Sequence, residues 1–180
     1  MPETDEMLDA TTALIPPLLT ALDALSYAGR HMHPPNIKVV VGAIESYQQP
    51  LEFGLEVFTN VPWPEDLADF AAHAKSSATL ALKAFAGFTT AAQDQGPDPA
   101  MGAYRAMGLS TKAIEAAYPL SYMLPPVSRY FLEPSHRDNQ PLLEALGKSD
   151  VQMPNVGVMH ADNASQERGG FSVYIPEYYA

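Results

Sequence analysis

Few residues in this sequence have the types and spacing needed for catalysis or metal binding. His31 and His33 flank Met32 just before two prolines, and His160 is followed two positions later by Asp162. Two histidines at i and i+2 diverge on a helix, and a zinc site needs at least three protein ligands. On a strand, side chains at i and i+2 share a face, so a histidine and a carboxylate there could act as a base and its orienting group. Because the first pair diverges and lacks a third ligand, we expect it to end a helix. Because no nucleophile accompanies the second pair, we expect it to end a strand.

A serine nucleophile is also missing from the sequence pattern. Serine hydrolases of the α/β type hold their nucleophile in a Gly-x-Ser-x-Gly turn between a strand and a helix. Gly108-Leu109-Ser110 begins in this way but continues with Thr111-Lys112, so the second glycine is absent. The sequence contains no HGG segment to supply oxyanion-hole amides and no cysteine to supply a thiolate. We therefore assign no catalytic, cofactor-binding or metal-ligating residue to this chain.

The composition predicts a folded and strongly acidic protein. Of the 180 residues, 47% are apolar, and 21 acidic against 10 basic side chains give a net charge of −11. Such a surface repels phosphate backbones, so we expect no nucleic-acid partner. No apolar run approaches the ~20 residues of a membrane span, and the first ten residues are acidic, unlike a signal peptide. Together with the absence of cysteine, these features predict a cytoplasmic protein without a membrane span, metal or cofactor.

The first helix is expected where four leucines recur at steps of three and four, which places them on one stripe of a helix: Leu14, Leu18, Leu22 and Leu25. Proline is tolerated in the first turn of a helix and not later. We therefore predict that this helix begins near Pro16 and Pro17 and ends at Gly29. The acidic residues before it, 1–10, are expected to form an N-terminal tail.

Two further helices are predicted between residues 37 and 95. The stretch 37–58 has helical apolar spacing, and Pro50 should break or kink it. The next helix is expected to start at Glu65 and Asp66, because carboxylates in a first turn complement the helix dipole. Gly96 and the proline after it should end this helix.

The remaining helical segments complete a predicted domain of residues 11–150. Asp98 followed by Pro99 is typical of a helix start, and the helix should end at Pro119. A short helix is expected at 141–146, closed by Gly147. With their short, proline-rich connections, these segments predict a mainly α fold: an antiparallel bundle or cluster of four to five helices.

The last thirty residues, 151–180, have a different pattern and predict a β-hairpin. The segments 156–160 and 170–175 are rich in β-branched and aromatic residues, and a polar loop separates them. Two strands alone make a marginal sheet in water, so we expect this hairpin to pair with further strands.

The segment VGVMHADNASQERGGFSVYIPEYY at 156–179 resembles the entry into bacterial α/β-hydrolases of the phospholipase/carboxylesterase type. In that family an opening strand, a loop with an RGG turn and a strand close to FSLYVPEYY precede the strand with the oxyanion motif. LPPVSRYFLEP at 124–134 and AGRHMHPP at 28–35 also resemble the helical N-terminal region of such proteins. The resemblance implies that 151–180 starts a hydrolase domain whose catalytic motifs would follow Ala180. No catalytic residue of the family can be carried over to this chain.

These observations support one leading hypothesis. The chain would be the non-catalytic N-terminal helical region of a serine esterase, covering or flanking the active site or mediating assembly. The resemblance implies that the parent protein hydrolyses a small ester through an acyl-enzyme. The expected partner is the missing hydrolase catalytic domain or another copy of the chain.

Other functions stay open from the sequence. The chain could be a free-standing helical ligand-binding or protein-interaction module, or, if His31 and His33 converged with a carboxylate, a small metal-dependent enzyme. The run Arg129-Tyr130-Phe131-Leu132 between prolines is expected to pack against the missing domain, with local core packing or ligand contact as alternatives.

Overall fold

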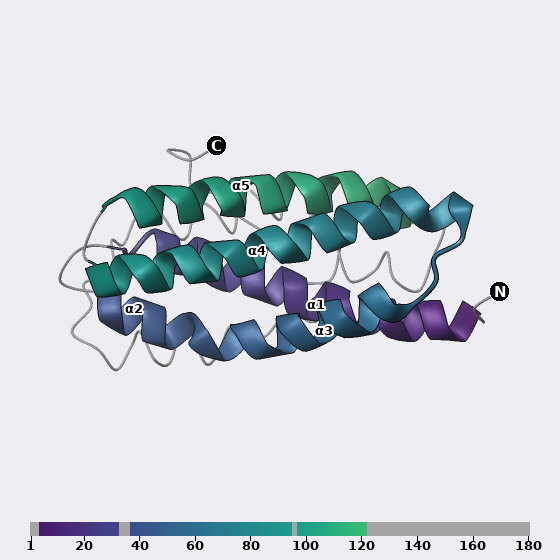
Figure 1. Cartoon of the computed structure of the whole chain (residues 1–180), viewed down its shortest axis with the longest axis horizontal. Coiled ribbons are helices and arrows are strands. Elements are labelled where there is room, and N and C mark those ends of the chain that lie inside the picture. The colour runs from purple at the N-terminus through teal and green to yellow at the C-terminus, as the bar shows by residue number, and fades with distance from the viewer. Residues whose placement is uncertain (1–3, 33–36, 95–96, 122–180) are drawn as a thin grey trace, which may run out of the picture.

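The computed structural model describes residues 4–32, 37–94 and 97–121, and these form a bundle of helices (Figure 1). The elements in chain order are α1 (Thr4–Gly29), α2 (Ile37–Ile44), η1 (Glu45–Tyr47), α3 (Gln48–Asn60), η2 (Glu65–Leu67), α4 (Ala68–Asp94) and α5 (Pro97–Leu120). Because α2, η1 and α3 follow one another without a gap, they make one rod of a four-helix bundle. The predicted mainly α fold is confirmed for the described residues. The predicted helix at 141–146 and the hairpin at 151–180 lie outside them.

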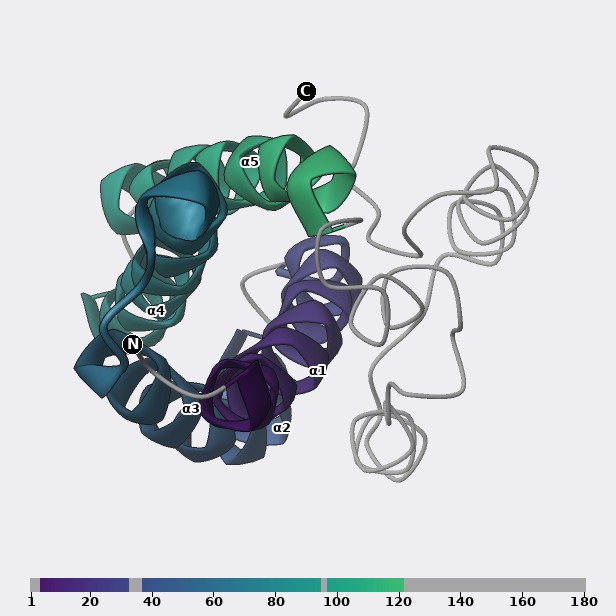
Figure 2. The same cartoon turned by 90° about the vertical axis from the view of Figure 1, so that its right-hand side faces the viewer.

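The rods follow one another around the bundle in the order of the sequence, as the end-on view in Figure 2 shows. The most extensive helix pairing is α4 with α5, and the next is α1 with α3. Short connections make consecutive rods antiparallel, so the C-terminal end of α1 lies beside the start of α5.

The first helix begins earlier than its prolines predict. α1 starts at Thr4 and carries Pro16 and Pro17 in its interior, so the predicted start near these prolines is wrong. An interior proline costs a helix about 3 kcal/mol through its missing amide hydrogen and its ring. Large aliphatic side chains on either side of the pair are almost fully buried: Leu14, Ile15, Leu18 and Leu19. Burying each contributes roughly 1.5–3 kcal/mol, which offsets the cost of the two prolines.

The second rod is interrupted near its proline, as predicted. Pro50 lies in the first turn of α3, and the 3-10 segment η1 directly precedes this helix. An α-helical bond from residue 50 to the carbonyl of Ser46 is impossible because proline has no amide hydrogen. The tighter 3-10 turn at 45–47 accommodates this break.

The predicted boundaries of the last two described helices are confirmed to within a few residues. Glu65 and Asp66 start η2, which leads into α4, and α5 includes Asp98 in its first turn. The α4 face toward the bundle is rich in alanine, with Ala74, Ala78 and Ala81 fully buried. Small side chains let α5 approach closely, and this is why α4 and α5 form the most extensive pair.

Aromatic residues fill the two ends of the bundle. Near the turn from α3 to α4, the rings of Phe58 and Trp63 lie 4.4 Å apart, and Phe70 packs edge-on against both. Near the turn from α4 to α5, the rings of Phe88 and Tyr104 are T-shaped with centroids 5.0 Å apart. The antiparallel order places these two clusters at opposite ends of the core.

α1 is long and apolar enough to cross a membrane, the only helix of the described part with this property. Length and composition alone are weak evidence for a membrane span, so the absence of one stays a prediction. Most of its apolar window is buried inside the bundle, and buried core helices of soluble proteins have the same length and composition.

Candidate functional site

The residues singled out for metal chemistry are only partly described. His31 follows α1, is fully buried, and its backbone amide donates to the carbonyl of Ala28 over 2.9 Å. It thus ends the helix, as predicted. His33, His160 and Asp162 lie outside the described residues, so whether either pair converges stays a prediction. Within ranges 4–32, 37–94 and 97–121, no three histidine, aspartate or glutamate side chains form a group that could hold a metal.

Ser110, the serine closest to a nucleophile motif, holds two helices together. Its hydroxyl donates to the carbonyl of Ser77 on α4 over 2.6 Å, and the Ser77 hydroxyl donates to the carbonyl of Ser110 over 2.9 Å. Both residues are fully buried, and their Oγ atoms lie 3.0 Å apart. These reciprocal bonds satisfy two buried hydroxyl groups between α4 and α5 and give Ser110 a structural role.

A cluster of polar residues instead occupies one side of the C-terminal half of α1. Asp23, Ser26 and Arg30 follow at i, i+3 and i+7, so they share one side of the helix. They are only 7%, 2% and 7% exposed. The Arg30 guanidinium lies 5.5 Å from the centre of the Tyr27 ring, a cation–π distance.

Burial of these charges requires compensation. An ionised carboxylate or guanidinium is rarely buried unless it is paired and hydrogen-bonded. Asp23, Tyr27 and Arg30 all take part in polar or ring interactions. Ser26 Oγ is buried without a hydrogen-bond partner in the structure as described. This side of α1 is therefore built as an interface and not as a solvent-exposed surface.

The neighbours of α1 show which way this polar side points. Gly54 of α3 approaches the backbone of Ala13 and Leu14, and Gly29 faces the side chains of Tyr104 and Met107 on α5. The Tyr104 hydroxyl also donates to the carbonyl of Gly29.

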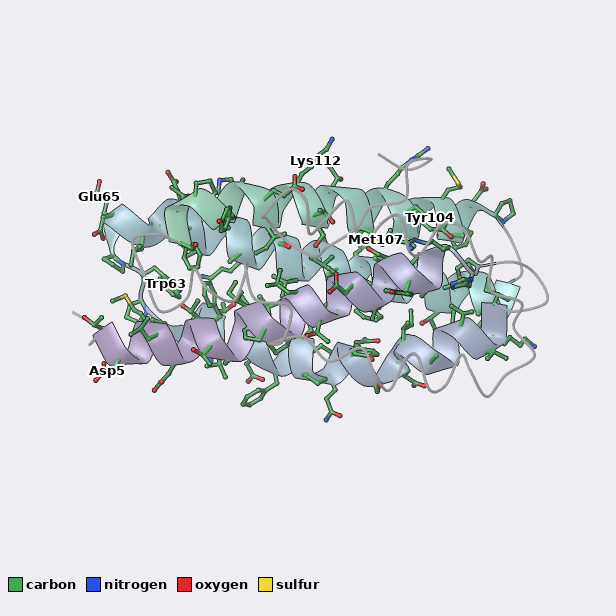
Figure 3. The ribbon with its side chains drawn as sticks, turned by 180° about the vertical axis from the view of Figure 1, so that it is seen from behind. Asp5, Trp63, Glu65, Tyr104, Met107 and Lys112 are labelled. Atoms are coloured by element: carbon green, nitrogen blue, oxygen red, sulfur yellow. The ribbon has the colours of Figure 1, made fainter. Side chains whose placement is uncertain are left out.

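Successive residues of an α-helix are about 100° apart around its axis. Asp23, Ser26 and Arg30 therefore lie about 60–120° around α1 from Gly29, on the side that points away from α3. The fully buried Ile15 and Leu19 extend the same side toward the N-terminus. We call these five residues the second face of α1. In Figure 3, no other described helix crosses in front of α1.

A second surface feature lies on the outer side of α5. Met101, Arg105, Leu109 and Lys112 recur at steps of three and four, and all four are exposed. Met101 and Leu109 are 44% and 54% exposed. We call these four residues the α5 stripe. It combines apolar and cationic side chains in a protein of net charge −11, and such a combination favours contact with another protein surface.

Neither the second face of α1 nor the α5 stripe was predicted from the sequence. The leucine spacing defines one apolar stripe on α1, and the acid and base at 23 and 30 lie beside that stripe. The sequence signal for the second face was an acid, a serine and a base at i, i+3 and i+7 within an otherwise apolar helix. For α5, the signal was the pair of cations spaced seven residues apart, with Leu109 between them.

Comparisons with known proteins do not place the chain in a family: no family model matches it, and neither does any curated protein or solved structure.

Proposed function

We propose that this chain is the N-terminal helical region of a serine ester hydrolase of the phospholipase/carboxylesterase type. In this role the bundle is non-catalytic and flanks or covers the active site of a hydrolase domain that continues the chain. The observation that carries the proposal is the resemblance of residues 156–179 to the first strands of such a domain.

The geometry of the bundle supports this role in two ways. The buried hydroxyls of Ser77 and Ser110 are committed to helix–helix hydrogen bonds, which suits a scaffold. The bundle also offers the α5 stripe, an outward surface on which a following domain could pack. The small ester substrate would then be bound by the hydrolase domain, with the bundle shaping access to it.

Ester hydrolysis tests the proposal directly. The 180-residue chain and a form extended at its C-terminus are assayed with p-nitrophenyl esters, with and without a serine-reactive phosphonate. We expect turnover by the extended form that the phosphonate abolishes, and none by the 180-residue chain. Phosphonate-sensitive turnover by the shorter chain, or an inactive extended form, would refute the proposal.

The α5 stripe also favours a second candidate, a free-standing helical protein-interaction module. In that case the stripe contacts a separate protein, and the 180-residue chain is a soluble, cooperatively folding unit. Replacing Leu109 with Glu distinguishes the candidates when the activity of the extended form is measured. A contact with a hydrolase domain predicts altered activity or stability of that form, whereas a separate partner predicts neither change.

A further inference from the structure

Exposed apolar side chains mark two opposite sides of the bundle. Among the described residues, the large apolar side chains that are exposed are Val39 and Phe53 on the second rod and Met101 and Leu109 on α5. Phe53 is the most exposed of them, at 64%. α3 and α5 both pack against α1 and α4, and Figures 1 and 2 show them on opposite sides of the bundle. The exposed apolar surfaces of α3 and α5 therefore face away from each other.

The surface around Phe53 is acidic. Gln49, Phe53, Glu56 and Asn60 recur on α3 at steps of three and four, and all four are exposed. The exposed Glu52 lies beside them on the same helix. We call these five residues the α3 patch. It presents an aromatic ring together with two carboxylates.

The α5 stripe is the counterpart of the α3 patch in charge and in length. It presents two apolar side chains together with the cations Arg105 and Lys112, and Figure 3 shows Lys112 pointing away from the bundle. The first and last residues are eleven positions apart in both the stripe and the patch, which is about 16 Å of helix. The acids of α5, Asp98 and Glu115, lie beyond the two ends of the stripe.

We propose that the two surfaces bind each other between copies of the chain. The α3 patch of one copy packs on the α5 stripe of the next, with Phe53 against Leu109 and the carboxylates beside the cations. Opposite charges then meet, and apolar side chains that are exposed in the single chain leave water. Two copies with a net charge of −11 repel each other in most orientations, so a cationic stripe is where an acidic patch docks with least repulsion.

A contact between two different surfaces on opposite sides of a molecule is heterologous. Each pair of copies leaves one α3 patch and one α5 stripe free, so further copies add head to tail until a ring closes or the chain ends. A single helix face of this length buries less area than a standard stable interface. The contact is therefore weak, and assembly rises with protein concentration.

The proposal goes beyond the proposed function, which allows either a following hydrolase domain or a separate protein on the α5 stripe. A stripe-to-stripe contact between two copies is a further alternative, but it would bring like charges together. The tests below use the 180-residue chain and no ester. Failure of the assembly and failure of the proposed function are therefore distinguishable.

The first test mixes two variants that each keep one of the two surfaces. Phe53→Glu disrupts the α3 patch and Leu109→Glu disrupts the α5 stripe, and both positions are exposed, so the fold should tolerate the changes. Sedimentation velocity over a concentration series measures the assembly, and helical circular dichroism checks the fold. The unaltered chain should gain mass with concentration, and each variant alone should stay monomeric. An equimolar mixture should form a species of two chains, because one intact patch meets one intact stripe.

Ala72→Glu, at an exposed position of α4, is the matched control and should assemble like the unaltered chain. Loss of assembly in this control, self-assembly of Phe53→Glu, or a mixture that stays monomeric would overturn the proposal. An unaltered 180-residue chain that is monomeric throughout, with Leu109→Glu affecting only the C-terminally extended form, would assign the stripe to the following domain and also overturn it.

The second test reverses the charges. Lysine replaces both Glu52 and Glu56, or glutamate replaces both Arg105 and Lys112. Either double change should raise the dissociation constant about 10-fold or more, because attraction becomes repulsion. The chain with all four changes should regain assembly to within about 3-fold, since the charges are again opposite. Its net charge is again −11, so recovery would not come from total charge. Unchanged assembly of either double variant, or no recovery in the fourfold variant, would overturn the proposal.

Discussion

The closest approach between α1 and α3 gives a sharp test of the packing. An added Cβ at Gly54 would lie 2.3 Å from the carbonyl oxygen of Ala13 and 3.0 Å from Leu14 Cα. Both are backbone atoms, so no side chain can rotate away. The helices would have to separate by roughly 1 Å, and a gap of that size forfeits a quarter to a half of each dispersion contact across the interface.

We therefore expect Gly54→Ala to destabilise the protein despite the better helix propensity of alanine. Overpacking of a core costs about 1–3 kcal/mol, and more where the backbone must move, whereas glycine to alanine in a helix gains about 1 kcal/mol. Because the contact is with backbone atoms, the upper part of this range applies, and the net loss should be about 1–2 kcal/mol, or a melting temperature lower by roughly 2–8 °C for a chain of this size.

Matched controls are available in the same protein. Gly42 on α2 and Gly102 on α5 have nothing within 4 Å of an added Cβ. Alanine at either position should raise stability by about 0.5–1 kcal/mol. Unfolding in urea followed by helical circular dichroism measures all three variants. If Gly54→Ala were as stable as the two controls, the close contact between α1 and α3 would be wrong.

Three further changes test the α4–α5 contact and the aromatic end of the bundle. Gly87→Ala should be less stable than the Gly42→Ala and Gly102→Ala controls by about 1–3 kcal/mol in urea unfolding, because its Cβ would lie 2.8 Å from a side chain of α5 and 3.0 Å from a backbone oxygen. Stability equal to that of the controls would contradict this contact. Ser77→Ala and Ser110→Ala should each cost about 0.5–1.5 kcal/mol in urea unfolding, because each removes one hydroxyl-to-carbonyl bond between α4 and α5. Unchanged stability of both variants would contradict a stabilising role for these bonds. Trp63→Phe should lower the stability by about 1 kcal/mol in thermal unfolding. It keeps an aromatic ring but removes the hydrogen bond that the indole N–H donates to the Phe58 carbonyl over 3.1 Å. An unchanged melting temperature would refute a role for that bond.

The helical part of the fold was predictable because its local signals agree with its packing. The carboxylates at Glu65 and Asp66, and Asp98 beside its proline, locate helix starts that the structure confirms. Pro50 likewise locates the interruption of the second rod. At each of these positions, backbone preference and burial favour the same conformation.

The start of α1 could not be predicted in this way, because two local signals oppose a long-range one. Pro16 and Pro17 indicate a helix start, and four acidic residues before Ala10 suggest a solvated tail. The helix nevertheless begins at Thr4, with Met7 and Ala10 buried. That burial depends on helices encoded far along the chain, so its contribution is not visible in the local sequence.

The second face of α1 was not predicted, because its charged residues lie outside the apolar stripe that the leucine spacing defines. These charges nevertheless affect which packing arrangements of α1 are stable. A single apolar stripe explains the packing of α1 in the bundle, and Asp23 and Arg30 add nothing to that stripe. Buried charges often stabilise less than apolar residues of equal size would, yet they penalise every arrangement that leaves them unpaired. An all-apolar α1 could slide or rotate among several packings of similar energy. An arrangement that left Asp23 or Arg30 buried without a partner would therefore be disfavoured. On this reasoning, the charges restrict how α1 can pack, and the leucines provide most of the stabilisation.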